Sequence, residues 1–194
     1  MSAYHPSGGS KGVIIAFHGG GFTGGSHTWD KVQNELLATA GYTVIQPEFP
    51  KTHSEFCKWA KENSFTDHAY RQKLYVLGRS SGGYLAKLYA SLNPLVEKCI
   101  YLAPVFDPIT RAAINTKFMG RTEEFFDEEP IDTTELSDNE LLLMAEADEN
   151  VPPDCFTAEQ LKKAVYLTKT HRGVCTMSSV KFRTLVDKFL SESD

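Results

Sequence analysis

Short apolar runs alternate along the chain with segments in which apolar residues recur at helical spacing. Six of the runs are rich in β-branched and aromatic residues and are apolar almost throughout, which is typical of strands buried on both faces of a sheet. The pattern therefore predicts an α/β fold with a six-stranded, mainly parallel sheet and helices on both faces. The six runs lie at residues 12–17, 42–47, 73–78, 98–103, 140–147 and 164–170.

Helices are predicted between the strands wherever apolar residues lie three and four positions apart. The first of these helices is expected to bury one apolar face and to end before Gly41. Part of residues 53–70 and residues 178–190 are also predicted to be helical. Thr157 and Gln160 form a capping box at the start of a short helix. The apolar face expected for the first helix consists of Trp29, Val32, Leu36, Leu37 and Ala40.

Length and composition suit one soluble domain with a sizeable core, since the chain has 194 residues, of which 41% are hydrophobic and 23% charged. No repeat or linker divides it, so we expect residues 1–194 to form a single domain. The least regular segment, 104–139, is expected to hold a crossing helix and a short cap or insert. Residues 121–140 are rich in carboxylates, which is typical of a solvated loop and would disfavour anionic substrates if the loop bordered a site.

Charge and cysteine usage argue against several functional classes. A formal net charge of −5 without a basic cluster argues against nucleic-acid binding. No apolar run has the length of a membrane span, and residues 1–12 lack the features of a signal peptide, so we expect a cytoplasmic protein with no membrane span. The four cysteines form no C-x-x-C pair, so no zinc site is expected. Cys155 and Cys175 fall in predicted loops, and the sequence leaves open whether they form a disulfide.

A glycine-rich turn follows the first predicted strand in the sequence VIIAFHGGGFTGG, residues 13–25. Gly19, Gly21 and Gly24 match the dinucleotide-binding pattern G-x-G-x-x-G. The same residues also suit a backbone amide cradle for an oxyanion. The helical pattern begins only near Thr28, too late to direct a helix N-terminus at a pyrophosphate, and this favours the oxyanion interpretation.

A second glycine turn, in LYVLGRSSGGYLAKLYA at residues 74–90, carries the sequence G-x-S-x-G between a strand and a helix. Glycines at 78 and 82 are expected because side chains there would collide with neighbouring elements. The turn forces Ser80 into a strained conformation above the sheet. Ser80 is therefore the candidate nucleophile.

A serine nucleophile needs a base and an acid that orients the base. Reactive groups gather at the carboxyl ends of parallel strands. Asp148 follows the fifth predicted strand and His171 follows the sixth, which makes them the candidate acid and base. Asp107, after the fourth strand, and Asp154, in the same loop as Asp148, are competing candidates for the acid.

With these motifs the chain resembles the α/β-hydrolase superfamily, and most closely its esterase and lipase branch. The sequence HGGGF at residues 18–22 resembles the oxyanion loop of hormone-sensitive-lipase-like esterases, and GRSSGG at 78–83 resembles their nucleophile elbow. DENVP at 148–152 is similar to the D-x-x-V-P acid loop, and His171 occupies the place of the family histidine. The chain departs from the branch at Arg79 and Ser81, where an acidic residue and alanine are usual. The family's first hairpin is also missing, which implies a trimmed sheet.

The resemblance implies a serine hydrolase that cleaves small to medium acyl esters through Ser80, Asp148 and His171. The amides of Gly20, Gly21 and Ser81 are the expected oxyanion donors. No cofactor or metal is expected. A thioesterase or peptidase would use the same groups, and a non-catalytic ligand-binding protein could keep the same fold. The residues expected to contact substrate are Phe22, Phe106 and Phe118.

Overall fold

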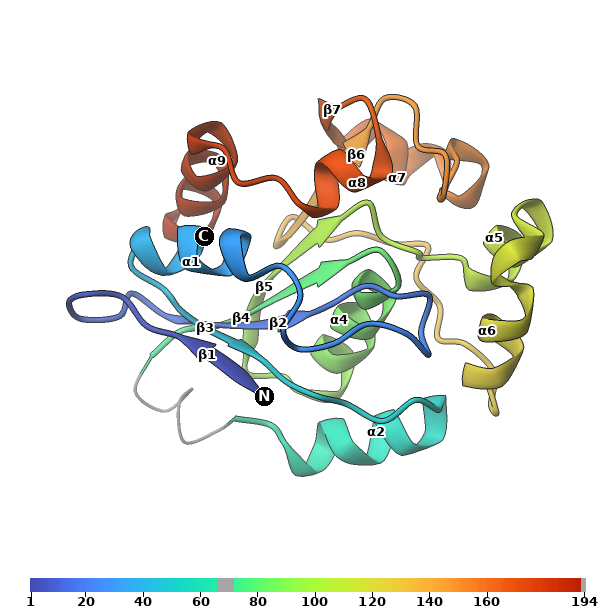
Figure 1. Ribbon diagram of the computed structural model, residues 1–194, viewed down its shortest axis with the longest axis horizontal. Helices are drawn as coiled ribbons and strands as arrows, with labels where there is room; N and C mark the ends of the chain where they lie inside the picture. The colour runs from blue at the N-terminus through green and yellow to red at the C-terminus, as the bar shows by residue number, and fades with distance from the viewer. Residues whose placement is uncertain (66–71, 193–194) are drawn as a thin grey trace.

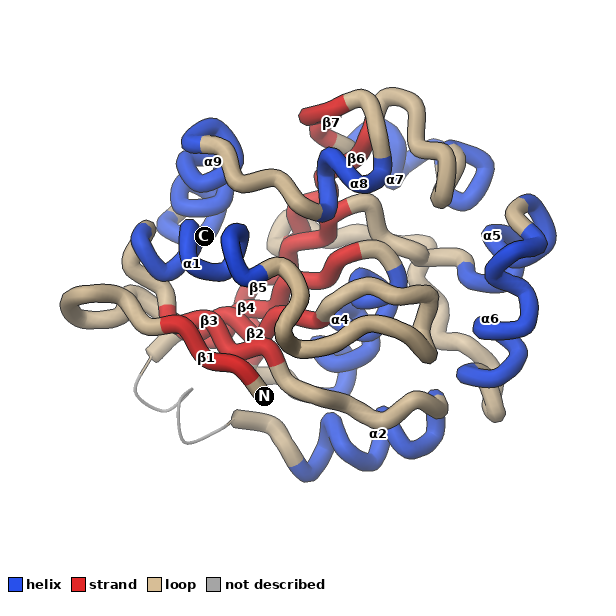
Figure 2. The backbone as a smooth tube through the Cα atoms, viewed as in Figure 1, coloured by secondary structure: helices blue, strands red, loops and turns tan. Residues whose placement is uncertain are grey.

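A seven-stranded sheet forms the centre of the computed structural model, which describes residues 1–65 and 72–192 (Figures 1 and 2). The strand order is β1-β3-β2-β4-β5-β6-β7. β1 runs antiparallel to β3, and each of the other pairings is parallel. The strands are β1 Ser2–Tyr4, β2 Val13–Phe17, β3 Thr43–Gln46, β4 Leu74–Arg79, β5 Val96–Leu102, β6 Glu140–Ala145 and β7 Val165–Thr168.

The six predicted strands are all present, and the fold class is confirmed, but the predicted strand count is wrong by one. The additional strand, β1, adds to the sheet at its edge, where it pairs with β3 through Ser2 opposite Gln46 and Tyr4 opposite Val44. It is three residues long, and none of its residues is fully buried. Such a short edge strand has no apolar run from which it could be predicted.

Helices cover both faces of the sheet, as expected (Figure 1). On one face, alternate residues of β2 and β4 pack against α2 and α4. On the other face, the remaining residues of the same strands pack against α1, α8 and α9. The helices are α1 Lys31–Thr39, α2 His53–Glu62, α4 Ser81–Leu92, α5 Pro108–Ile114, α6 Met119–Phe125, α7 Ala158–Lys163, α8 His171–Cys175 and α9 Val180–Ser191. The capping box of Thr157 and Gln160 is present at α7, and residues 66–70 of the segment predicted to be helical lie outside the described residues.

The predicted inward face of α1 is present at Leu36, Leu37 and Ala40, which pack in the core, but not in the residues before them. Trp29 and Val32 are 51% and 65% exposed, whereas Gln33 and Asn34 are buried. The reason is the side chain of Arg79, which is buried at the end of β4 and needs polar partners. The polar face of α1 supplies those partners, so it turns inward.

The segment between β5 and β6 lies beside the carboxyl ends of the strands (Figure 1). It contains α5, the 3-10 helix Thr116–Phe118 and α6. Phe125, at the end of α6, is fully buried, and its ring stacks on Phe22 with centroids 4.9 Å apart. This contact anchors α6 to the core below the glycine-rich loop.

Candidate active site

Ser80 lies in a strained turn between β4 and α4. Its φ and ψ angles are 53° and −124°, a combination that a non-glycine residue adopts only under strong constraint. The flanking glycines are required by close packing. A Cβ at Gly78 would lie 2.2 Å from the carbonyl oxygen of Gly82, and a Cβ at Gly82 would lie 2.4 Å from that of Phe17. The sterically forced turn expected from the sequence is therefore present.

The glycine-rich loop after β2 packs against this turn because β2 and β4 are adjacent and parallel. A Cβ at Gly19 would lie 3.2 Å from Cβ of Ser80. Gly20 has a φ of 125°, and its carbonyl accepts a hydrogen bond of 3.0 Å from the amide of Gly24. The loop thus bends back on itself beside Ser80. The next helix, α1, begins only at Lys31, so these glycines do not open a helix of the kind that holds a dinucleotide.

Asp148 and His171 form a hydrogen bond at the ends of β6 and β7. The distance from Nδ1 of His171 to Oδ2 of Asp148 is 2.8 Å, and both residues are buried. The other carboxylate oxygen, Oδ1, accepts hydrogen bonds from the amides of Asn150 at 2.8 Å and Val151 at 2.7 Å. Two amides of the loop after β6 therefore hold one oxygen of the Asp148 carboxylate, and the other oxygen contacts His171.

The competing acids lie elsewhere. Asp107 caps α5 by accepting a hydrogen bond of 2.8 Å from the amide of Thr110. Asp154 is part of the 3-10 helix Pro153–Cys155, and both Asp107 and Asp154 line a different, smaller cavity. Only Asp148 among these three candidates contacts His171.

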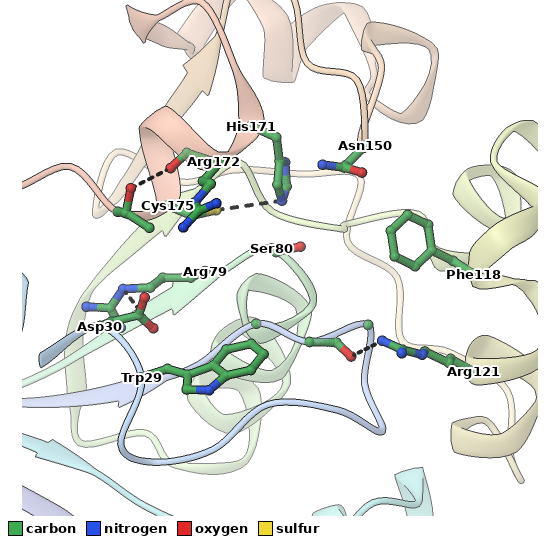
Figure 3. Close-up of a pocket in the computed structure, with 14 residues that line it drawn as sticks. Trp29, Asp30, Arg79, Ser80, Phe118, Arg121, Asn150, His171, Arg172 and Cys175 are labelled. Carbon is green, nitrogen blue, oxygen red and sulfur yellow. Dashed lines mark hydrogen bonds and ion pairs between the residues drawn. The ribbon is translucent and has the colours of Figure 1, made fainter.

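The environment of His171 raises the pKa of its imidazole. Burial by itself lowers this pKa, but the hydrogen bonds with Asp148 and Cys175 stabilise the protonated ring and outweigh the burial. Sγ of Cys175 lies 3.7 Å from Nε2 of His171. Ser80 and His171 form no hydrogen bond in the part of the chain that the structure describes, although Figure 3 shows the Ser80 hydroxyl below the imidazole.

A cavity of about 570 Å³ joins these elements (Figure 3). The predicted residues Ser80, His171, Gly20 and Gly21 line it, and Asp148 lies behind His171. Several other residues that line the cavity were not predicted from the sequence. The sequence could have indicated two of these residues, because Arg172 is adjacent to His171 and Cys175 lies one helical turn after it. The unanticipated residues are Trp29, Asp30, Arg79, Arg121, Asn150, Arg172, Cys175 and Thr176.

Of the three phenylalanines expected to contact substrate, Phe118 lines the cavity and the other two do not. Phe22 is 1% exposed and packs on Phe125 and Tyr84. Phe106 is 2% exposed and packs edge-on against Tyr101. Both rings belong to the hydrophobic core.

Arg79, the residue before Ser80, is held in a buried polar network. Its Nη2 donates a hydrogen bond of 2.6 Å to Oδ1 of Asn34, and its Nε donates to Oε1 of Gln33. The carboxylate of Asp30 lies 3.7 Å from the same Nε. Arg79 therefore ties the turn at Ser80 to α1.

The cysteines, histidines and carboxylates of the described residues gather in no cluster of three or more suited to a metal ion. All four cysteines are free thiols, which answers the open question of a disulfide between Cys155 and Cys175. None of the helices described combines the length and the apolar character that crossing a bilayer requires.

Solved structures of esterases share this fold. An esterase from Pyrobaculum calidifontis has a TM-score of 0.65 and 17% identity, with 95% of this chain and 76% of that chain covered. The Thermogutta terrifontis esterase 2 has a TM-score of 0.72 and 20% identity, with coverages of 97% and 87%. A thermophilic carboxylesterase cloned from a metagenomic library has a TM-score of 0.66 and 19% identity, with coverages of 93% and 78%.

No curated protein matches the sequence. A family model for the alpha/beta hydrolase fold matches residues 14–152, a range that begins within β2 and ends in the loop after Asp148. Ser80 and Asp148 lie within the matched range, and His171 lies beyond it. The chain belongs to the alpha/beta hydrolase fold family.

Proposed function

We propose that this chain is a serine hydrolase that cleaves carboxylic esters with small to medium acyl groups. The observation that carries the proposal is the convergence of three features on one cavity. These are the strained turn at Ser80, the 2.8 Å hydrogen bond between His171 and Asp148, and the glycine-rich loop. This is the arrangement that acyl transfer through a serine requires.

In the proposed reaction, Oγ of Ser80 attacks the carbonyl carbon of the ester while Nε2 of His171 accepts the hydroxyl proton. The imidazole turns from Cys175 toward Ser80 for this step, and a sulfur contact of 3.7 Å offers little resistance. The negative charge that develops on the carbonyl oxygen is stabilised by the amides of Gly20, Gly21 and Ser81. Asp148 holds the imidazole in the tautomer that leaves Nε2 free to accept the proton.

The intermediate collapses when the C–O bond to the alcohol breaks and His171 returns its proton to the leaving oxygen. Water then attacks the acyl carbon bonded to Ser80 while His171 accepts one water proton, and the bond from this carbon to Oγ breaks as His171 returns the proton to Oγ. The products are an acid and an alcohol, and no redox step is involved. The choice of esters rests on the esterases that share the fold, since a thioesterase or peptidase would use the same three side chains.

Labelling with a fluorophosphonate probe tests the nucleophile directly. A solved structure shows the Thermogutta terrifontis esterase 2 phosphonylated by sarin, which supports this class of reagent. We expect the wild-type chain to be labelled on Ser80, as mapped by peptide mass spectrometry, and Ser80→Ala to lose the label. Ser81→Ala is the matched control, because it keeps the backbone amide while removing the neighbouring hydroxyl.

A panel of esters, thioesters and peptides with matched acyl groups then identifies the leaving group. We expect ester turnover that Ser80→Ala abolishes. Labelling of Ser81 or Cys175 instead of Ser80 would contradict the assigned nucleophile. A folded wild-type chain with neither labelling nor turnover would favour a non-catalytic binding protein.

A further inference from the structure

Arginine dominates the charge of the candidate active site. Three arginines, Arg79, Arg121 and Arg172, are among the residues that line the cavity, together with one acidic residue, Asp30. Asp30 lies 3.7 Å from Arg79. Arg121 and Arg172 form no ion pair with any residue that the structure describes. The cavity is thus cationic although the chain carries a formal net charge of −5.

Two of these guanidinium groups lie on either side of the candidate nucleophile. Figure 3 shows Arg172 on the same side as Cys175 and Arg121 below Phe118, with Ser80 between them. Arg121 is fixed against the glycine-rich loop by a hydrogen bond of 3.1 Å from Nη1 to the carbonyl of Gly20. Its remaining N–H groups are free to meet a ligand, because a guanidinium carries five donors.

Two further cationic side chains, those of Arg111 and Lys117, lie against the ring of Phe118, which lines the cavity. Arg111 is 1% exposed, and its guanidinium carbon lies 4.0 Å from the ring centroid of Phe118. Its Nε and Nη2 have no hydrogen-bond partner among the described residues. Burial, together with the charge of Arg121, lowers the pKa of Arg111 to about 10, which still leaves it cationic at neutral pH. Nζ of Lys117 lies 4.8 Å from the same ring centroid.

Nearby carboxylates do not cancel this charge inside the cavity. Glu149 accepts a hydrogen bond of 3.2 Å from the amide of His171, and its other oxygen accepts one from Asn150. Glu123 and Glu124 on α6 are exposed to solvent. None of these three groups lines the cavity. The acidic segment 121–140 therefore contributes its arginine, and not its carboxylates, to the site.

We infer that the cavity binds esters that carry a carboxylate several atoms from the scissile carbonyl, with Arg121 and Arg172 recognising that carboxylate. This inference rests on the proposed function and names its substrate class. A carboxylate accepts two parallel hydrogen bonds from a guanidinium, which a neutral group of the same shape cannot match. The two arginines give two possible positions for the carboxylate, on the acyl part or on the alcohol part of the ester.

Two pairs of substrates distinguish these positions. The acyl pair is a chromogenic phenyl monoester of adipic acid and its ω-carboxamide counterpart. The alcohol pair is the butyrate ester of 4-hydroxybenzoate and that of 4-hydroxybenzamide. We expect the charged member of at least one pair to have a kcat/KM about tenfold higher or more, through a lower KM, and we expect this preference to shrink with added salt.

Arg121→Gln and Arg172→Gln assign the contact, and the readout is the ratio of kcat/KM between charged and neutral substrates. A loosened glycine-rich loop in Arg121→Gln would slow both members of a pair and leave the ratio unchanged. Loss of a carboxylate contact lowers the ratio toward one. Lys162→Gln is the control for net charge, because Lys162 is exposed on α7 and pairs with Glu159. This control is expected to keep the wild-type ratio.

The outcomes separate this inference from the proposed function. If Ser80 is labelled and neutral esters turn over as well as charged ones, the inference is wrong and the proposed function stands. If labelling and turnover are both absent, the proposed function is wrong. Calorimetry of adipate and adipamide with the wild-type chain tests the anion preference without turnover, and equal affinities would overturn it.

Discussion

Sγ of Cys175 lies 3.7 Å from Nε2 of His171, the ring nitrogen that would accept the proton of Ser80 in the proposed reaction. The two residues are four positions apart in α8, so the helix itself brings them together. The thiol also lies 3.6 Å from the carbonyl of Leu102, to which it can donate. Cys175 therefore holds the imidazole in a resting orientation and helps to raise the pKa of His171.

Replacing Cys175 by alanine should move the pH dependence of the reaction. The imidazole must be neutral to act as a base, and a raised pKa confines the neutral form to higher pH. Cys175→Ala removes one of the contacts that raise the pKa of His171, so the acidic limb of kcat/KM should shift to lower pH. The measurement is a pH profile on a neutral ester. Cys57→Ala, in α2, is the matched control, and identical profiles for all three proteins would contradict the role assigned to Cys175.

Asp148→Asn should reduce turnover by about 10⁴, the loss seen when the acid of a serine triad is neutralised. The amide cannot stabilise the imidazolium, and its NH₂ group favours the wrong tautomer of His171. Steady-state kcat on a neutral ester measures this effect. Asp107→Asn is a suitable control because asparagine also caps helices well, so α5 should persist. Near-normal turnover in Asp148→Asn beside a large loss in Asp107→Asn would assign the acid to the other strand.

Arg79→Met should destabilise the fold by about 3–5 kcal/mol, because it leaves Asp30, Gln33 and Asn34 without their buried partner. Urea unfolding followed by fluorescence measures the free energy. Adding Asp30→Asn should recover part of the loss by removing the unpaired charge. As a control, Lys73→Met breaks an exposed pair with Glu97 and should cost at most about 1 kcal/mol. A similar cost for the two methionine variants would show that the network does not stabilise the turn.

The sequence predicted most of the sheet because six of its strands are continuous apolar runs, and such runs form buried strands in any α/β fold. The same logic placed Ser80, Asp148 and His171 at strand ends, and strand order brings those ends together. Their catalytic roles stay predictions until labelling and kinetics test them. Periodicity correctly predicted Leu37 as an inward residue of α1 but failed at Trp29 and Val32, because Gln33 and Asn34 are buried in a polar network there instead.

The lining of the cavity was the hardest feature to predict. Phe22 and Phe106 follow strands in sequence, as residues of a site would, yet their rings pack in the core. Arg121 reaches the site from α6 through a contact with Gly20, a hundred residues away, and no local pattern reports such a contact. Side chains from irregular segments depend on tertiary packing, which hydrophobic periodicity does not encode.

The site should show no interfacial activation on lipid droplets or micelles. A lid that opens on a lipid surface needs a hinged segment with a broad apolar underside, and α6 is the nearest candidate. Two contacts hold α6 in place, namely the stacking of Phe125 on Phe22 and the hydrogen bond from Arg121 to Gly20. Much of the segment that follows α6 is acidic and exposed, which opposes binding to an anionic interface.

The rate on a short-chain ester should therefore saturate smoothly as its concentration passes the solubility limit. Met119→Gln removes a side chain on α6 that is 40% exposed, and it should leave this curve unchanged. A sharp rise in rate when droplets appear, lost in Met119→Gln, would show instead that α6 is a lipid-responsive flap.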